Sequence, residues 1–201
     1  MPVRAVVLAG SPRVGGNSDI LAERLVAGLR AGGAEVELLH ARALKVGNCR
    51  ACYYCSRTGE CIQTDDMQRL YRLFSESHRL CLVTPVFFCQ TPSITQAIIE
   101  RCQTLWTRKY HRHEALPALA YPRQGLIVGV GGTRGPKVFD SLRCLARYWL
   151  DTVDIRDYQV LTYNNVDEKG AILQRPEALQ EVYQAGLRLA ADASQAPLNC
   201  G

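Results

Sequence analysis

The chain has 201 residues, 47% of them hydrophobic, which suits one domain with a sizeable core. Its net charge is +5, and its basic residues are dispersed apart from RKYHRH at 108–113, which excludes the basic stripe of a typical nucleic-acid-binding protein. The N-terminal apolar run, Ala5 to Gly10, is too short for a secretory leader or a membrane span. We therefore expect a single domain over residues 1–201, located in the cytoplasm, with neither nucleic acid nor membrane as a partner.

Residues 3–9 (VRAVVLA) form an apolar run typical of a buried parallel strand. A glycine-rich turn follows, and then a helical pattern with Asn17 or Ser18 as its cap and Gly32-Gly33 as its stop. Further strands are expected at 35–40, within 79–88, at 124–132 and at 155–163, and further helices at 65–78, 91–106, 136–153 and 175–193. Five alternations of strand and helix predict an α/β fold, a doubly wound five-stranded parallel sheet with helices on both faces.

The turn after the first expected strand, GSPRVGGNS, has the composition of a phosphate-binding loop. Ser11 and Ser18 offer hydroxyl groups, Asn17 an amide and Arg13 a positive charge, and the helix N-terminus adds unpaired N–H groups. The triphosphate motif GxxxxGK[ST] and the dinucleotide motif GxGxxG do not occur here, so the monophosphate of FMN is favoured. The alternative is a glycine-rich turn that only caps a helix.

Two further loops should meet the first one, because ligands of an open parallel sheet lie beyond the carboxyl ends of its strands. The loop after the third strand, TPVFFCQTPS, would present backbone N–H groups and a flat apolar surface to a ring through Pro85, Val86, Phe87 and Phe88. In the loop after the fourth strand, GVGGTRG, Gly131 and Gly132 allow close approach of a ligand. Phe87 and Phe88 could equally belong to the core.

Four thiols are crowded into CRACYYCSRTGEC, at Cys49, Cys52, Cys55 and Cys61. They lie in a connection of about 24 residues, where about two to six are usual in such a fold, and this length favours a functional loop. Disulfides are disfavoured in the cytoplasm. The CxxCxxC spacing is that of ferredoxin-type runs, so the first interpretation is one 4Fe–4S cluster held by all four cysteines. Zinc is the main alternative, and thiols without metal are the third.

Other cysteines and the histidines carry no functional motif. Cys81, Cys102 and Cys144 lie among apolar residues and are expected to act as small buried hydrophobes. The four histidines are expected to be structural or exposed. No catalytic acid or base is predicted, because the electron transfer described below needs none.

GSPRVGGNS, the four-cysteine loop, the DDM at 65–67 and TPVFF together resemble the NADPH-dependent FMN reductase family, which has a flavodoxin-like fold. The spacing of the cysteines is similar to that of the iron–sulfur flavoproteins within that family. The likeness runs over roughly residues 3–110. One departure lies in the third helix, where relatives often carry lysine and phenylalanine and this chain has Gln96, Ala97 and Ile98, although Arg101 fits the usual pattern.

The resemblance implies that Ser11, Arg13, Asn17 and Ser18 bind FMN, and that TPVFF and the glycines near 131 cover its ring. It also implies that the four cysteines bind one 4Fe–4S cluster. The expected assembly is a homodimer or homotetramer in which the cluster of one chain approaches the flavin of another.

A flavin exchanges electrons singly or as a hydride, whereas a cluster passes one at a time. The expected function is that of an FMN-dependent oxidoreductase, passing electrons between NAD(P)H or ferredoxin and an acceptor. Backbone N–H groups near Val86 to Phe88 are expected to stabilise the reduced flavin. Two alternatives remain open: an NAD(P)H-dependent FMN or quinone reductase whose cysteine loop is structural, with zinc or no metal, and a non-enzymatic flavin redox sensor.

Overall fold

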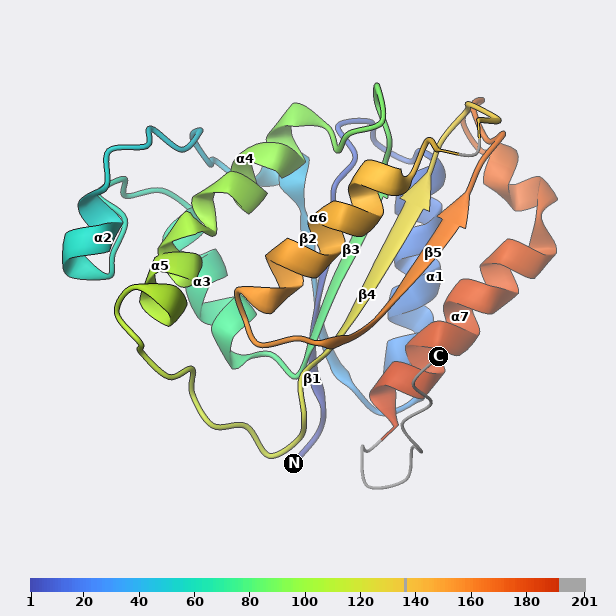
Figure 1. The fold of residues 1–201 in the computed structure, drawn as a ribbon. Helices are drawn as coiled ribbons and strands as arrows, with labels where there is room; N and C mark the ends of the chain where they lie inside the picture. The colour runs from blue at the N-terminus through green and yellow to red at the C-terminus, as the bar shows by residue number, and fades with distance from the viewer. Residues whose placement is uncertain (136, 192–201) are drawn as a thin grey trace.

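The structure is a computed structural model that describes residues 1–135 and 137–191. Five strands form one sheet in the order β2-β1-β3-β4-β5 (Figure 1). Every neighbouring pair of strands is parallel. The strands are β1 (Arg4–Ala9), β2 (Glu35–His40), β3 (Arg79–Pro85), β4 (Gln124–Val130) and β5 (Asp157–Tyr163). This is the flavodoxin-like order, whose switch point lies between β1 and β3, and it confirms the predicted fold class.

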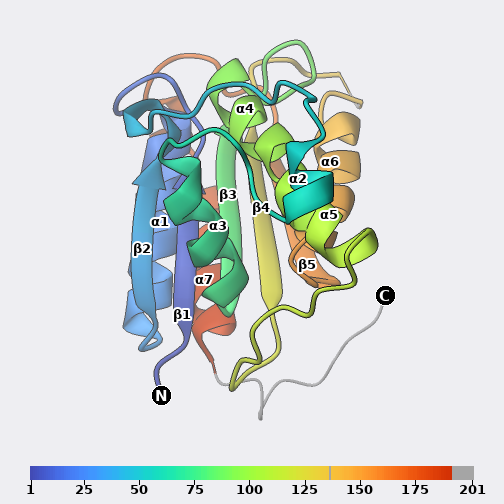
Figure 2. The ribbon, with the colours of Figure 1, turned by 90° about the vertical axis from the view of Figure 1, so that its left-hand side faces the viewer.

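Helices cover both faces of the sheet (Figures 1 and 2). On one face α1 (Asn17–Ala31) and α7 (Pro176–Ala190) pack together over a core shared with β1, β3 and β4. The opposite core is covered by α3 (Met67–Glu76), α4 (Ser93–Arg101), α5 (Gln103–Tyr110) and α6 (Asp140–Asp151). The central strands β3 and β4 are mostly apolar because both of their faces are buried.

Three short elements are absent from the sequence-based expectation. They are the 3₁₀ helices η1 (Ala41–Ala43) and η2 (Ala171–Gln174) and the short helix α2 (Tyr54–Thr58). Helix α2 forms part of the cysteine loop and lies against α5, outside the layered fold (Figure 2). No helix within the described ranges has the length and apolar character needed to cross a membrane.

The helix expected at 91–106 is two helices, α4 and α5, which meet at Cys102. At the break the Tyr71 hydroxyl donates to the Arg101 carbonyl at 2.9 Å. In an unbroken helix that carbonyl accepts the amide four residues later. A tertiary contact therefore coincides with the end of α4. Helix α1 begins at Asn17 with Gly16 as its N-cap, so the prediction of Asn17 or Ser18 as the cap is wrong. Helices α3, α6 and α7 are shorter than expected, and positions 136 and 192–193 of those expectations lie outside the described residues.

Two of the three cysteines predicted to be buried are in the core. Cys81 and Cys102 are buried, and burial raises the pKa of each thiol to about 12. The prediction for Cys144 is wrong, because its side chain is exposed. Its helix, α6, turns Leu142 and Ala146 inward, and Cys144 falls on the outer face between them.

Candidate functional site

The three predicted ligand loops meet at a cavity of about 410 Å³ at the carboxyl ends of β1, β3 and β4. That volume is within the range of small-molecule sites. The cavity is lined by Ser11, Arg13, Asn17, Ser18, Pro85, Val86, Phe87, Gly131 and Gly132, together with Gly16, Val130, Thr133, Val166 and Asp167. Every residue predicted to bind the cofactor is thus in the lining except Phe88.

The first loop is bent so that α1 begins at the cavity. The Ser11 hydroxyl accepts the Arg13 N–H at 3.1 Å and lies 3.2 Å from the Arg13 carbonyl, to which it donates. Gly15 has a φ of +64°, a left-handed conformation that favours glycine. No side chain among the described residues caps the N-terminus of α1, so its first amides face the cavity end without a capping oxygen.

A buried ion pair beneath this loop was not found by sequence reasoning. Asp19 accepts the Gly15 N–H at 2.8 Å and pairs with Arg42 from η1, with Nη1 and Nη2 each 2.9 Å from a carboxylate oxygen. Arg42 also donates to the Ser11 carbonyl at 3.2 Å. The carboxylate thus holds the loop, and the guanidinium neutralises it beside a site expected to bind an anion. The acidic first turn of α1 was the available signal, but its partner lies far along the sequence.

Asn17 has a second task besides lining the cavity. Its amide nitrogen donates to the Glu168 carbonyl at 2.8 Å, and its oxygen accepts the Ile172 N–H at 3.2 Å. Asn17 therefore attaches the segment after β5 to the phosphate loop. That segment contributes Val166 and Asp167 to the cavity, and neither residue lies in a recognisable sequence motif.

The loop after β3 differs from the expectation in two ways. The N–H groups of Val86 and Phe87 donate to the carbonyls of Val130 and Gln90, both at 2.9 Å, so these two amides are not free for a ligand. Phe87 is half exposed and lines the cavity, whereas Phe88 is fully exposed, has a φ of +50° and lies outside the lining. The alternative that Phe87 and Phe88 belong to the hydrophobic core is therefore wrong for both side chains.

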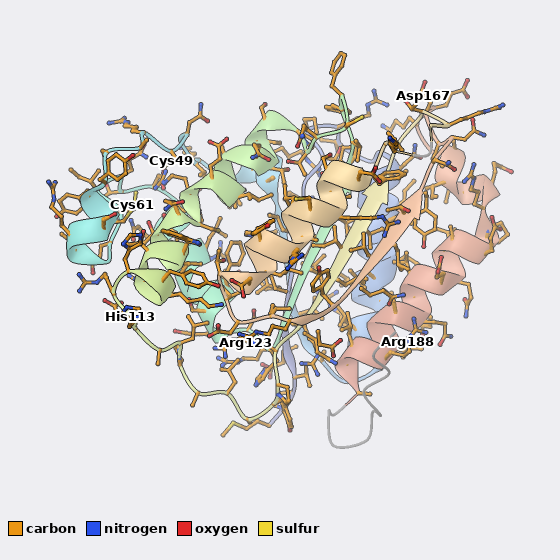
Figure 3. All side chains as sticks on the ribbon, viewed as in Figure 1. Cys49, Cys61, His113, Arg123, Asp167 and Arg188 are labelled. Atoms are coloured by element: carbon orange, nitrogen blue, oxygen red, sulfur yellow. The ribbon has the colours of Figure 1, made fainter. Side chains whose placement is uncertain are left out.

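A second cavity, of about 670 Å³, is lined by all four clustered cysteines together with Arg101, Trp106 and His111 among others. Figure 3 places Cys49 and Cys61 beside α2, and Asp167 at the opposite side of the view, near the ends of β4 and β5. The two cavities share no lining residue. Within the described residues, no three His, Cys, Asp or Glu side chains are grouped closely enough to hold one metal ion.

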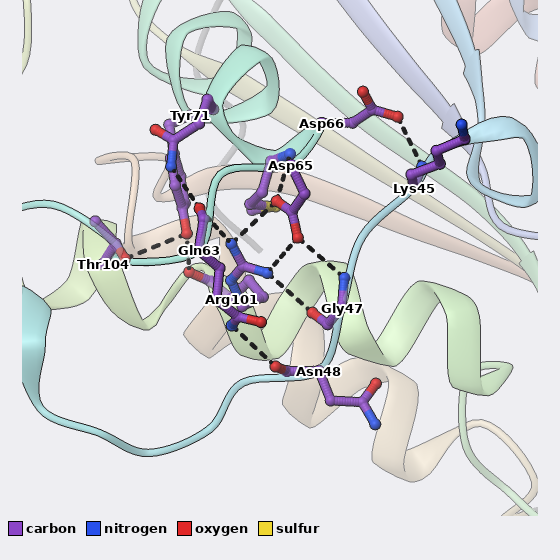
Figure 4. Close-up of polar contacts among 11 residues, drawn as sticks. Lys45, Gly47, Asn48, Gln63, Asp65, Asp66, Tyr71, Arg101 and Thr104 are labelled. Carbon is purple, nitrogen blue, oxygen red and sulfur yellow. Dashed lines mark hydrogen bonds and ion pairs between the residues drawn. The ribbon is translucent and has the colours of Figure 1, made fainter.

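Polar contacts hold the cysteine loop at its base (Figure 4). Asp65 accepts N–H groups from Gly47 at 3.0 Å and from Met67 at 3.1 Å, and it pairs with Arg101. Partial burial by itself would raise the pKa of Asp65, but the hydrogen bonds from Arg101 and the two amides hold that pKa below its ordinary value.

The parallel sheet order and the cavity at its switch point define a flavodoxin-like mononucleotide-binding class of protein. Within that class, the chain belongs to the NADPH-dependent FMN reductase family, whose sequence pattern matches residues 3–167.

Similar proteins include iron–sulfur flavoproteins of Archaeoglobus fulgidus. One is 35% identical over 99 residues, which cover 49% of this chain and 45% of that protein. Another is 29% identical over 129 residues, which cover 64% of this chain and 62% of that protein. The matched part thus spans about half to under two thirds of these relatives.

Solved structures show the same fold at low sequence identity. The NAD(P)H:quinone oxidoreductase from Methanothermobacter marburgensis has a TM-score of 0.72 at 15% identity, covering 95% of this chain and 98% of that one. An FMN-dependent NADH-azoreductase from Bacillus anthracis, solved in complex with FMN, has a TM-score of 0.66 at 15% identity, covering 94% and 100%. At these identities the likeness concerns the fold alone.

Proposed function

We propose that this chain is an FMN-dependent oxidoreductase that carries a 4Fe–4S cluster and passes electrons between NAD(P)H or a ferredoxin and an acceptor. The observation that carries the proposal is the pairing of two cavities in one chain. One lies at the switch point of a flavodoxin-like sheet, and the lining of the other includes all four clustered cysteines. Membership of the FMN reductase family and the names of the similar iron–sulfur flavoproteins support it.

The residues of the first cavity suit FMN. Arg13, the hydroxyls of Ser11 and Ser18 and the free amides of α1 would hold the phosphate, with Asn17 fixing the adjoining wall. Val86, Phe87 and the glycines after β4 line the same cavity and would contact the ring. Bound FMN supplies hydride and one-electron chemistry, and the chain's part is to bind and orient it.

The spacing of the cysteines and the names of the similar iron–sulfur flavoproteins favour a cluster over one zinc ion in the second cavity. Zinc draws four thiolates to a single point at about 2.3 Å, whereas a cluster takes each thiolate on a different iron and leaves them around a wider volume. Cys49, Cys52, Cys55 and Cys61 are all among the residues that line the cavity of about 670 Å³. We propose these four cysteines as the cluster ligands.

We further propose that the chain acts as a homodimer or homotetramer. The two cavities are separate within one chain, so a second copy could bring a flavin to a cluster. Exposed Trp106, Tyr110 and Tyr148 provide apolar surface of the kind that association buries. Analytical ultracentrifugation tests this, and a monomer at micromolar concentration would contradict it.

The decisive experiment is anaerobic purification followed by metal analysis, flavin analysis and absorption spectroscopy. We expect FMN together with about four irons per chain and broad absorption at about 400 nm. Yellow, iron-free protein with NAD(P)H turnover would favour the flavin or quinone reductase alternative. A chain that takes up no flavin from excess FMN would refute the proposal.

A further inference from the structure

Arg101, the last residue of α4, places a charge in the interior of the protein. Its side chain is 1% exposed and forms a two-pronged ion pair with Asp65, with Nη1 2.8 Å from Oδ2 and Nη2 3.1 Å from Oδ1. Apolar residues at such positions are often as stabilising as a buried ion pair, or more so. A role beyond stability would therefore explain why this position holds a charge.

The pair connects the two ends of the cysteine loop (Figure 4). Before the cysteines, the Gly47 carbonyl accepts from Arg101 Nη1 at 3.0 Å. After them, the Gln63 carbonyl accepts from Arg101 Nη2 at 3.4 Å, and the Gln63 amide donates to the Asn48 carbonyl at 3.1 Å. Residues on both sides of the four ligands are thus held together by one side chain, which reduces the entropy lost when the thiolates are ordered around a ligand.

Arg101 is also among the residues that line the cavity of the four cysteines. Its Nε is buried and has no hydrogen-bond partner among the residues that the structure describes. Burial by itself would lower the pKa of Arg101, but the hydrogen bond to Asp65 helps to hold that pKa above its ordinary value, so the group stays charged. An anionic group in the cavity would lie beside a fixed, buried cation.

We propose that Arg101 is the positioning residue of the cysteine loop and that its charge raises the reduction potential of the cluster bound there. The inference rests on the proposed cluster. Reduction adds an electron to an anionic centre, and nearby charge and hydrogen bonds to sulfur set its potential. Asp65 holds the loop with Arg101 but carries the opposite charge. The two residues therefore act together on loop order and oppositely on the potential.

The test compares Arg101→Met, Arg101→Lys and Asp65→Asn in the full chain with its FMN. Arg123→Met is the control, because Arg123 is a half-buried arginine that donates to the carbonyls of Ser75 and Pro117 but does not line the cysteine cavity. Amide hydrogen exchange over residues 47–63 is measured without cluster. After anaerobic reconstitution, the midpoint potential is titrated by electron paramagnetic resonance, and iron loss to a chelator is timed.

We expect faster amide hydrogen exchange over residues 47–63 in all three variants, since each one breaks the two-pronged ion pair between Arg101 and Asp65. The potential should fall in Arg101→Met and rise in Asp65→Asn. Arg101→Lys should keep the wild-type potential but lose iron several-fold faster, because an ammonium group cannot reproduce the two parallel hydrogen bonds of the guanidinium to Asp65. Arg123→Met should match wild type throughout.

Amide hydrogen exchange over residues 47–63 at the wild-type rate in the Arg101 variants would overturn the positioning role. Unchanged reduction potentials in Arg101→Met and Asp65→Asn would overturn the charge effect. Shifts of the same sign would also overturn it, since a loosened loop alone changes the potential of both variants in the same direction. If Arg101→Met does not fold, Arg101→Lys decides the positioning role and Asp65→Asn the charge effect. A wild-type chain that takes up no cluster refutes the proposed function and the charge effect together, while exchange on the cluster-free chain still decides the positioning role.

Discussion

At the scale of single residues, the predicted phosphate loop depends on a carboxylate that a phosphate site would ordinarily exclude. Asp19 orders the loop through the Gly15 amide, and Arg42 cancels its charge. The pair therefore supplies order without repelling an anion, provided that both partners are present. Removing either one should affect the binding of the phosphate more than the binding of the ring.

We predict that Asp19→Asn weakens FMN binding on the order of tenfold, the cost of a charge-assisted hydrogen bond, and leaves riboflavin binding unchanged. Arg42→Met should weaken FMN binding more, because it leaves Asp19 unpaired beside the phosphate. Fluorescence titration of both flavins measures this, with exposed Arg24→Met as the control. Equal losses for FMN and riboflavin would show that the phosphate lies elsewhere.

The ion pair of Asp65 should make the stability of the protein depend on pH. Its folded-state pKa lies below the ordinary value of 3.8, so its contribution to stability is present above that pH and is lost as pH falls through the folded-state pKa. In the cluster-free chain, the free energy of unfolding of wild type should exceed that of Asp65→Asn at pH 7, and the gap should shrink below about pH 4. Urea unfolding at both values measures it. A gap that is constant with pH would contradict the assigned ion pair.

At the scale of elements, α1 and α7 pack in close contact through glycine residues. Gly28 and Gly186 face each other, and a Cβ at Gly186 would lie 2.6 Å from the Leu25 carbonyl oxygen and 2.8 Å from the Leu29 nitrogen. Both obstacles are backbone atoms, which cannot rotate away. The helix that begins at the phosphate loop is thus held in place through a glycine contact.

Gly186→Ala should therefore lower the free energy of unfolding by about 1–3 kcal/mol, the usual cost of overpacking a core. Gly135→Ala is the control, because a Cβ there meets only the Thr133 methyl at 3.7 Å. Chemical denaturation compares the two. Equal stabilities would show that the helices separate without cost.

At the scale of the whole molecule, the two cavities are lined by different residues and should bind their ligands independently. We predict that Cys55→Ser abolishes the bound iron and keeps wild-type FMN content, measured on the same anaerobic preparation. Stoichiometric iron in this variant would show that Cys55 is not a ligand. Loss of FMN would show that the cavities are coupled.

The sequence by itself determined the order of elements, the parallel sheet and the position of the three loops, because strand and helix patterns report on neighbours along the chain and parallel strands bring their carboxyl ends to one edge. Only the tertiary structure decided what holds those loops. Asp19 with Arg42 and Asp65 with Arg101 join segments far apart in sequence. The amides of Val86 and Phe87 are used internally, and Cys144 faces outward. Such contacts depend on how whole elements pack, and no local pattern of residues encodes that.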